Sequence, residues 1–269
     1  MGDTTIQQHT IVTLTTDFGW QDYYLALIKG ALLCQNPTLN LVDLTHQIEN
    51  YDIVRASFIF KNAWHHFPKG TIHILTVNDS SGPSSFLAME KDGHFFIGPD
   101  NGIFSLIFEE VPKEIYRLPA ENDSNFELKG IFSRAVSHIS EGRGLYSIGE
   151  RQETLLTRIS FQPVTGASHI RGAVIHIDNY DNVITNISRE LFDRIGYNRS
   201  FKLTFKGHDP ILRICEHYYD VPIGEILCLF NSADHLEVAI NMGNAAGLLG
   251  FDLEDTIQIE FLDAEEPND

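Results

Sequence analysis

Cysteine is scarce in this sequence, long hydrophobic runs are missing, and basic residues are few. The three cysteines, Cys34, Cys215 and Cys228, stand far apart in apolar stretches, which favours buried thiols in a reducing compartment over a disulfide framework or a zinc site. No segment approaches the roughly 18 uninterrupted apolar residues of a membrane-spanning helix. The first ten residues lack the charged and apolar regions of a secretory signal. A cytoplasmic location is therefore expected.

The shortage of basic residues sets the charge. The 19 lysines and arginines face 37 aspartates and glutamates, which gives a formal net charge of -18. Such a surface repels phosphate backbones and anionic lipids, so neither nucleic acid nor a membrane is an expected partner. A neutral or cationic small ligand is compatible with it, although solubility alone also explains such a charge.

Several signature motifs are missing as well. The sequence has no GxGxxG, Walker, GxSxG or CxxC pattern. Its histidines do not show metal-ligand spacing, since His65 and His66 are adjacent at the end of a predicted helix and His46, His73 and His94 stand alone. We therefore expect neither a metal site nor a bound cofactor.

What is present is a regular alternation of elements in the first half of the chain. Period-2 and helical patterns predict βαβ units, a largely parallel sheet and an α/β fold. Asp52 is the expected cap of the second helix, and Asp92-Gly93 the turn of a hairpin. The expected strands are Ile11–Thr16, Leu39–Leu44, Thr71–Val77, Phe86–Glu90 and His94–Ile97, and the expected helices are Asp22–Gln35, Asp52–Pro68, Gly102–Phe108 and Ile131–Ile139.

The second half changes character from about Gly172 onward. Short β-rich runs separated by turn residues predict a small antiparallel barrel or sandwich. With Gln162–Ser168 as the linker, the expected domains are residues 1–162 (α/β) and 169–269 (β-barrel). The expected strands are Ala173–Ile177, Val183–Ile187, Phe201–Phe205, Glu225–Phe230, Leu236–Ile240 and Thr256–Phe261.

Asp17 is the first candidate for chemistry. It follows a buried-looking strand and precedes Phe18-Gly19, so its carboxylate is expected at the carboxyl edge of the sheet, where open α/β folds bind ligands. There it can accept hydrogen bonds from both hydroxyls of a ribose, or simply form a turn or helix cap. The segments Gly98–Gly102 and Asp178–Asn182 are likewise typical of turns, although an asparagine also suits an adenine edge.

A series of segments gives a more specific signal. In chain order they are Thr15–Gly19, Phe67–His73, Gly98–Gly102, Asp178–Ile187, Tyr218–Glu225 and Asn231–Ala246. Together they resemble the S-adenosylmethionine hydroxide adenosyltransferase family, whose relatives include fluorinating and chlorinating enzymes, over about residues 10 to 262. The resemblance implies an amino-terminal α/β domain, a carboxyl-terminal β-barrel, and a homotrimer with active sites between one subunit's amino-terminal domain and its neighbour's barrel.

The resemblance also implies a nucleoside-binding set. Asp17 corresponds to the residue that holds the ribose hydroxyls, and Asp22 lines the same pocket. Tyr51 matches the aromatic position beside the ribose, and Met242 belongs to the same substrate-binding set.

On the adenine and methionine side, Tyr180 and Tyr218 correspond to rings that sandwich the adenine, and Asn182 bonds its edge. Asp178 and Ser232 correspond to contacts with the methionine ammonium and carboxylate. Ordinary barrel packing is the alternative for the two tyrosines.

The sequence departs from the family at the nucleophile-positioning trio. Asn78, Ser85 and Glu127 stand where members of the hydroxide type have Asp, Arg and His. Asp79 replaces the aspartate only if its loop shifts, and Ala233 occupies the place of a halogenase arginine. Glu127 either faces the pocket or lies in solvent on a loop that has drifted.

Two functions follow as hypotheses. The first is a hydrolase that uses water to cleave S-adenosylmethionine to adenosine and L-methionine, with Glu127 and Asn78 or Asp79 orienting the water. The alternative is a catalytically silent protein that binds adenosine or S-adenosylmethionine. An anionic Glu127 would repel a halide, so halogenation is not expected.

Overall fold

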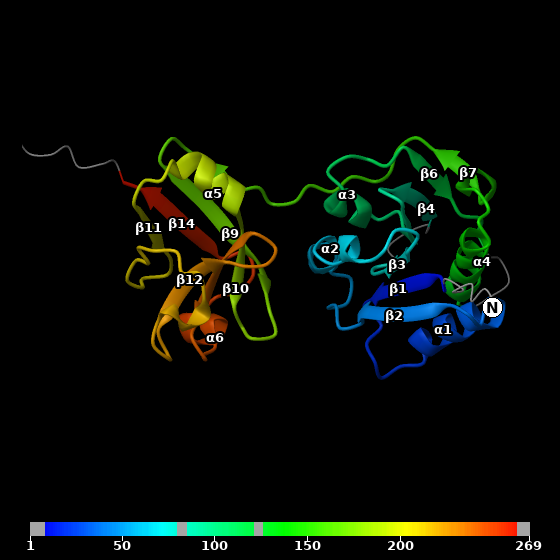
Figure 1. Cartoon of the computed structure of the whole chain (residues 1–269), viewed down its shortest axis with the longest axis horizontal. Coiled ribbons are helices and arrows are strands. Elements are labelled where there is room, and N and C mark those ends of the chain that lie inside the picture. Colours follow the sequence, from blue (N-terminus) through cyan, green and yellow to red (C-terminus); the bar gives the residue numbers. More distant parts are fainter. Residues whose placement is uncertain (1–8, 80–84, 121–125, 263–269) are drawn as a thin grey trace, which may run out of the picture. The chain divides into compact units, whose positions relative to one another are not determined.

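The computed structural model describes residues 9–79, 85–120 and 126–262 (Figure 1). The chain divides into two compact units, Met1–Ser160 and Phe161–Asp269, and each unit has buried apolar clusters of its own. Within the described residues, no helix is both long enough and apolar enough to cross a membrane.

A seven-stranded mixed sheet forms the centre of the first unit, in the order β2-β1-β3-β5-β4-β6-β7. The pairs β2–β1, β1–β3 and β3–β5 are parallel, and the pairs β5–β4, β4–β6 and β6–β7 are antiparallel. The α/β class is confirmed, with a sheet that is only partly parallel. The strands are β1 (Ile11–Thr16), β2 (Asn40–Thr45), β3 (Ile72–Thr76), β4 (Phe86–Lys91), β5 (His94–Pro99), β6 (Glu114–Arg117) and β7 (Glu150–Gln152).

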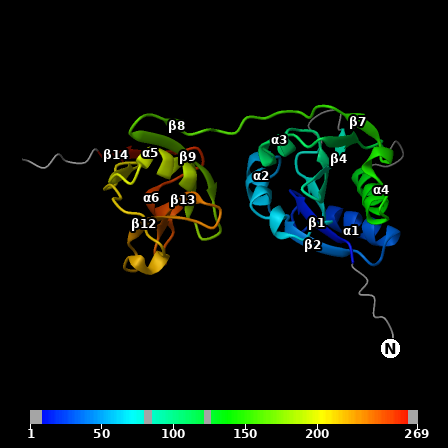
Figure 2. The same ribbon diagram turned by 45° about the horizontal axis from the view of Figure 1, so that its top comes forward.

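Helices cover both faces of this sheet (Figure 2). α1 (Tyr24–Gln35) and α4 (Leu128–Ser140) pack on one face, and α2 (Ile53–Lys61) and α3 (Ile103–Ile107) on the other. Strand side chains alternate between the two cores, since Phe86 and Ala88 of β4 face α1 and α4 while Leu87 and Met89 face α2 and α3. Two short 3-10 helices, η1 (Trp64–His66) and η2 (Leu145–Ser147), complete the unit.

Local sequence signals explain two of these elements. Asp52 caps α2 as expected, because its Oδ1 accepts the backbone amide of Arg55 at 2.9 Å. Asp92 and Gly93 both have positive φ, 54° and 84°, as a two-residue hairpin turn between β4 and β5 requires.

Two histidines that are distant in sequence meet inside this unit. His73 Nε2 lies 3.2 Å from His94 Nδ1, and His73 Nδ1 lies 2.7 Å from the Thr13 hydroxyl. Burial, followed by the nearby His94, lowers the pKa of His73 to about 3. Both imidazoles are therefore neutral parts of the core at ordinary pH.

The second unit is an antiparallel sheet in the order β11-β14-β9-β10-β13-β12, with β8 added to β9. All six expected strands are present. The sheet curls, but no ladder joins its edge strands β11 and β12 within the described part of the chain, so it is an open half-barrel. The elements are β8 (Val164–Thr165), β9 (His169–Ile177), β10 (Val183–Ser188), α5 (Arg189–Gly196), β11 (Phe201–Thr204), η3 (Tyr218–Asp220), β12 (Ile226–Phe230), β13 (His235–Ile240), α6 (Ala245–Leu249) and β14 (Thr256–Phe261).

The segment between the units lies earlier in the chain than expected. Val164–Thr165, inside the expected linker Gln162–Ser168, pairs with β9, and the run without helix or strand is residues 153–163. On one side the Leu156 amide donates to Asp100 Oδ1 at 2.8 Å, and on the other Asn186 Nδ2 donates to the Phe161 carbonyl at 2.9 Å.

Candidate functional site

A cavity of about 460 Å³ in the amino-terminal unit holds five of the predicted residues. We call it the amino-terminal cavity. Its lining consists of Asp17, Asp22, Tyr51, Asp79 and Glu127, together with Phe18, Tyr24, Asn50, Phe86, Phe126 and Leu128.

Asp17 is the structural centre of this cavity. It follows the last residue of β1, and its Oδ2 accepts the backbone amides of Tyr51 at 3.0 Å and of Asn78 at 3.2 Å. Tyr51 and Asn78 both have positive φ, 71° and 54°, a conformation that costs free energy for residues with a side chain. The carboxylate offsets that cost through charge-assisted hydrogen bonds. Asp17 therefore organises two turns and lines the cavity as well.

A row of polar side chains next to the cavity holds the end of β1. The Thr16 hydroxyl lies 2.9 Å from His46 Nδ1, and His46 Nε2 lies 3.0 Å from Asp43 Oδ1. Burial lowers the pKa of His46, so the ring is neutral. For Asp43, burial acts to raise the pKa, but hydrogen bonds from Lys29 and His46 outweigh it, and the pKa falls. The hydrogen bonds from Thr16 to His46 and from Lys29 to Asp43 hold the strand end in place.

The charge of the amino-terminal cavity is negative. Four of its lining side chains are carboxylates, those of Asp17, Asp22, Asp79 and Glu127. None of the described lining residues is basic. Carboxylates on a cavity wall attract a cation and repel a halide. The Thr76 hydroxyl donates to Asp79 Oδ2 at 3.3 Å, which helps to fix that side chain.

Glu127 lines this cavity, as the first of its two interpretations requires. It is the residue before α4, its side chain makes no cap hydrogen bond to that helix, and it is half-buried. Residues 121–125 of the same loop lie outside the described residues. Its carboxylate is therefore available to the cavity.

The other two members of the altered trio do not line the cavity. Asn78 contributes its backbone amide to Asp17, and Ser85 uses its carbonyl to accept the Asp100 amide at 2.8 Å. Buried Asn101 donates to the carbonyls of Val77 and Asn78 at 2.8 and 2.9 Å. Asn101 of the Gly98–Gly102 segment therefore stabilises backbone turns, which was one of the two roles that the sequence suggested for this segment.

Sequence reasoning missed four aromatic rings of this cavity, those of Phe18, Tyr24, Phe86 and Phe126. Phe18 and Tyr24 have ring centroids 6.0 Å apart, and Phe126 lies 5.4 Å from Tyr24 and 6.3 Å from Phe18. Tyr24 lies within the expected helix Asp22–Gln35 but was not among the candidate site residues. The sequence did contain a signal for two of these rings, because Phe18 directly follows Asp17 and Phe126 directly precedes Glu127.

A second cavity, of about 510 Å³, lies in the carboxyl-terminal unit, and we call it the carboxyl-terminal cavity. Three predicted residues line it: Asp178, Tyr218 and Ser232. The rest of the lining is Ile184, Glu216, His217, Tyr219, Leu229, Phe230, Asn231 and Glu237.

Asp178 organises the turn between β9 and β10. Its Oδ1 accepts the backbone amides of Tyr180 and Asn182 at 2.8 and 2.9 Å, and its Oδ2 accepts from Asn182 Nδ2 at 3.1 Å. Asn182 is buried beside it, whereas Tyr180 and Met242 are 78% and 86% exposed. The structure therefore brings Asp178, Tyr218 and Ser232 together in the lining, but not Tyr180, Asn182 or Met242.

Glu237, which was not a candidate, lies beneath this cavity. The Tyr218 hydroxyl donates to its Oε1 at 2.7 Å, and Asn231 Nδ2 donates to its Oε2 at 3.2 Å. Burial raises the pKa of Glu237 despite these two hydrogen bonds, and burial together with Glu237 raises the pKa of Tyr218. The signal in the sequence was an acidic residue inside the apolar run Leu236–Ile240.

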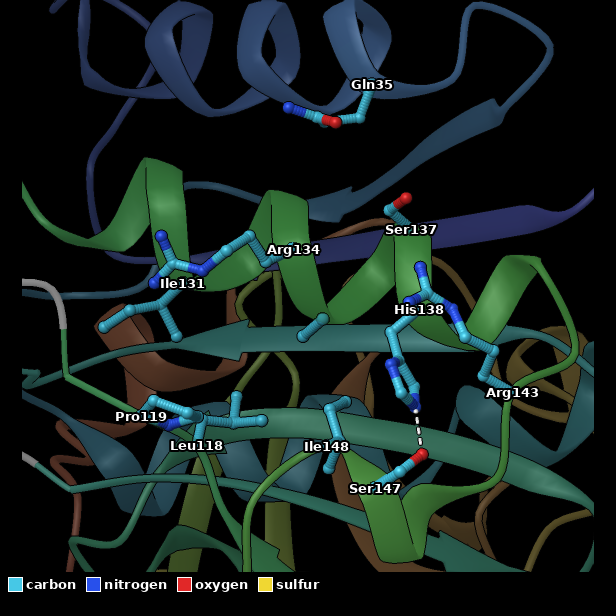
Figure 3. A pocket seen from close by; sticks show the side chains of 11 residues that line it. Gln35, Leu118, Pro119, Ile131, Arg134, Ser137, His138, Arg143, Ser147 and Ile148 are labelled. Atoms are coloured by element: carbon cyan, nitrogen blue, oxygen red, sulfur yellow. Dashed lines mark hydrogen bonds between the residues drawn. The ribbon is translucent and has the colours of Figure 1, made fainter.

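A third cavity, of about 360 Å³, contains none of the predicted residues (Figure 3). It lies among α1, α4 and η2, and its basic side chains include His138 and Arg143. His138 Nε2 contacts the Gly144 carbonyl at 3.0 Å and the Ser147 hydroxyl at 3.2 Å, and Arg143 pairs with Glu141 at 2.6 Å. These groups are engaged with the protein itself, so the candidate site remains in the first two cavities.

Comparison with known protein families shows to which family the chain belongs. The model of the SAM hydroxide adenosyltransferase N-terminal domain matches residues 12–149, and that of the C-terminal domain matches residues 172–258. The chain belongs to the SAM hydroxide adenosyltransferase family. The resemblance expected from the segment order is thereby confirmed.

Relatives of this SAM hydroxide adenosyltransferase family member match along nearly their whole length. A protein of Methanocaldococcus jannaschii named (R)-S-adenosyl-L-methionine hydrolase is 27% identical and covers 93% of this chain and 95% of its own. A fluorinase of Nocardia brasiliensis is 23% identical, with 90% and 94% covered. The crystal structure of an uncharacterized conserved protein from Thermotoga maritima superposes with a TM-score of 0.82 at 26% identity, covering 93% of this chain and 99% of that one.

Proposed function

We propose that this family member uses water to cleave S-adenosylmethionine into adenosine and L-methionine. The observation that carries the proposal is a cavity lined by four carboxylates and no basic described residue, in a chain related over its length to proteins named as hydrolases of this substrate. S-adenosylmethionine carries a sulfonium cation, which such a cavity attracts. The same carboxylates disfavour a halide nucleophile, so the proposal is for a hydrolase and not a halogenase.

The reaction needs little acid catalysis. The oxygen of water forms a bond to the ribose C5′ while the C5′–S bond breaks, and the electron pair of that bond goes to sulfur. Methionine thus leaves as a neutral thioether, and the proton lost by the water is taken up by a base. The protein supplies alignment and desolvation of the water. This chemistry calls for no cofactor, and we propose that none is bound.

Glu127 and Asp79 are the groups we assign to the water. Both are carboxylates of the amino-terminal cavity, so either can accept its proton or hold its hydrogen atoms. Asp17 is assigned to the ribose hydroxyls, with Asp22 and Tyr51 beside it. On the carboxyl-terminal unit, Tyr218 is assigned to the adenine face, and Asp178 and Ser232 to the methionine portion.

The remaining residues of the binding set line neither of the two cavities. The backbone amide of Asn182 donates to Asp178, and Tyr180 and Met242 are exposed. Each unit thus holds only part of the set implied by the family resemblance. We propose the homotrimer expected from that resemblance as the working assembly. Light scattering checks it, and a mass near a single chain's 30.4 kDa at all concentrations would contradict it.

A cytoplasmic location is also proposed. It is supported by the three free cysteines. Cys215 and Cys228 are buried as expected, whereas Cys34 is exposed. Such thiols are usual in a reducing compartment.

Incubation of the pure protein with S-adenosylmethionine tests the function. Chromatography should show adenosine and methionine in equal amounts, and the reaction in ¹⁸O-labelled water should place the label in the adenosine 5′-hydroxyl. EDTA should leave the rate unchanged, and added chloride or fluoride should give no halogenated nucleoside. Adenosine formation no faster than in a protein-free control would overturn the hydrolase and leave only a silent binder.

A further inference from the structure

Glu237 is an unusual residue for its place in the sheet. It lies in β13 between Leu236 and Val238, which belong to the apolar core, and it is only 2% exposed. A buried carboxylate is costly unless hydrogen bonds satisfy it, and an apolar residue of similar volume is often as stable or more so. Stability of the sheet therefore does not explain a glutamate here.

Both carboxylate oxygens are committed to residues of the carboxyl-terminal cavity. Oε1 accepts from the Tyr218 hydroxyl at 2.7 Å, and Oε2 accepts from Asn231 Nδ2 at 3.2 Å. Both donors line the cavity. The carboxylate thus joins two parts of the wall that are distant in sequence.

Tyr218 needs such an anchor. It belongs to the three-residue helix η3, and the residue is 43% exposed, so packing alone holds the ring weakly. The backbone of this turn is fixed separately, because Asp220 Oδ2 accepts the amides of Glu216 and His217 at 2.9 and 3.0 Å. The ring of Tyr218 is therefore held at one end by this backbone and at the other by the hydrogen bond from its hydroxyl to Glu237.

Asn231 transmits the same constraint to the neighbouring turn. Its Nδ2 is held by Glu237, while its Oδ1 accepts the backbone amides of Ala233 and His235 at 3.0 and 3.2 Å. Ser232 lies inside this turn and in the cavity lining. Glu237 therefore orients both the aromatic wall and the turn that carries Ser232.

We infer that Glu237 is a positioning residue that sets ligand affinity by fixing Tyr218 and Asn231 in the wall of the carboxyl-terminal cavity. This inference rests on the proposed function, since it assumes that the ligand is a nucleoside. It places no reacting atom on Glu237. A hydrogen bond from a phenol to a carboxylate also makes the ring more electron-rich, which favours a cationic ligand near its face.

A double-mutant cycle on ligand binding tests the inference. Glu237→Gln and Tyr218→Phe each remove the charge-assisted bond while keeping size and shape. Calorimetry with adenosine should show that each single variant binds about tenfold or more weakly, and that the double variant binds little worse than the weaker single variant. Losses that multiply in the double variant would mean that Glu237 does not act through Tyr218.

Turnover separates positioning from a merely structural role. Glu237→Gln should raise KM for S-adenosylmethionine about tenfold and leave kcat within about twofold, because the groups it holds bind and do not react. A structural defect would instead reduce the folded fraction and lower kcat at an unchanged KM. Glu260→Gln, an exposed glutamate of β14, is the matched control and should change neither constant.

The outcomes separate the two claims. If the parent turns over or binds the nucleoside and Glu237→Gln matches it in KM and affinity, the positioning inference is wrong and the proposed function stands. If the parent neither binds adenosine nor cleaves S-adenosylmethionine, the proposed function fails and the inference fails with it. Should Glu237→Gln not fold, Tyr218→Phe alone must still raise KM, and an unchanged KM would refute the inference.

Discussion

The Asp17 carboxylate accepts the backbone amide of Asn78 at 3.2 Å, and this bond joins the end of β1 to the turn that follows β3. Because the same oxygen accepts the Tyr51 amide, one carboxylate ties together three segments of the amino-terminal cavity. Asp17 has a structural role whether or not a ligand is bound. Experiments on it must therefore separate folding from binding.

Asp17→Ala should abolish adenosine binding measurable at millimolar concentration. The variant loses charge-assisted bonds to the ribose, each on the order of 1.5–3 kcal/mol, and also the two amide bonds that shape the cavity. Calorimetry measures binding, and urea unfolding reports the accompanying loss of stability. Asp209→Ala, at an exposed loop position, is the control. Parental affinity in Asp17→Ala would show that Asp17 is a turn residue only.

Glu127→Gln should lower the rate of S-adenosylmethionine hydrolysis by about 10²-fold, the usual contribution of a general base. Adenosine binding should persist, because only the charge that orients the water is removed. Single-turnover kinetics and calorimetry measure the two effects, with the exposed Glu110→Gln as control. A Glu127→Gln variant as fast as the parent would exclude a catalytic role for this residue.

Restoring the trio of the hydroxide type should raise the rate. The variant Asn78→Asp, Ser85→Arg and Glu127→His reintroduces the side chains found in those family members. Asp tolerates the positive φ of 54° at position 78 nearly as well as Asn, so the first substitution suits the backbone. We expect kcat/KM to increase by about tenfold or more. A slower triple variant that still binds adenosine would indicate that this cavity works with its own carboxylates.

The buried His73 makes stability depend on pH. Its pKa is about 3 in the folded protein and near 6.5 when unfolded, so the unfolded state binds more protons between these values. The contribution of the neutral, buried His73 to the free energy of unfolding is fully present above pH 6.5. It decreases as the pH falls toward 3. Between pH 6.5 and 5 the loss should be roughly 2 kcal/mol in the free energy of unfolding.

Urea unfolding at several pH values measures this dependence. His73→Gln should make the profile shallower, because the substituted side chain does not titrate, while His46 and His94, whose pKa values burial also lowers, keep part of the dependence. The variant will be less stable at pH 7.5. His208→Gln, whose histidine is only half-buried, is the control. An unfolding midpoint equal at pH 7.5 and pH 5 in the parent would contradict the assignment to His73.

Most of the fold was predictable because buried strands carry a strong local pattern. β1 matches its expected range, and every expected β-run of the second half forms a strand. β6 and β7 were missed because they are short, and β7 has no buried residue to give a hydrophobic pattern. α5 was also missed, although Ser188 caps it through the Leu191 amide at 3.1 Å.

The site was predictable only where a residue belongs to a recognisable segment. Asp17 and Tyr218 come from such segments, and both line cavities. Tyr24 and Glu237 were missed because their roles depend on partners far away in the chain, Phe126 and Tyr218 respectively. Local spacing contains no information about such tertiary contacts.

The two anchors of the segment between the units have a practical consequence. Leu156 is tied to Asp100 and Phe161 to Asn186, whereas Ile159 between them is 91% exposed. A protease that requires an accessible apolar residue should cut there first. Because each side of the cut keeps its own apolar cluster, both fragments should remain folded after digestion.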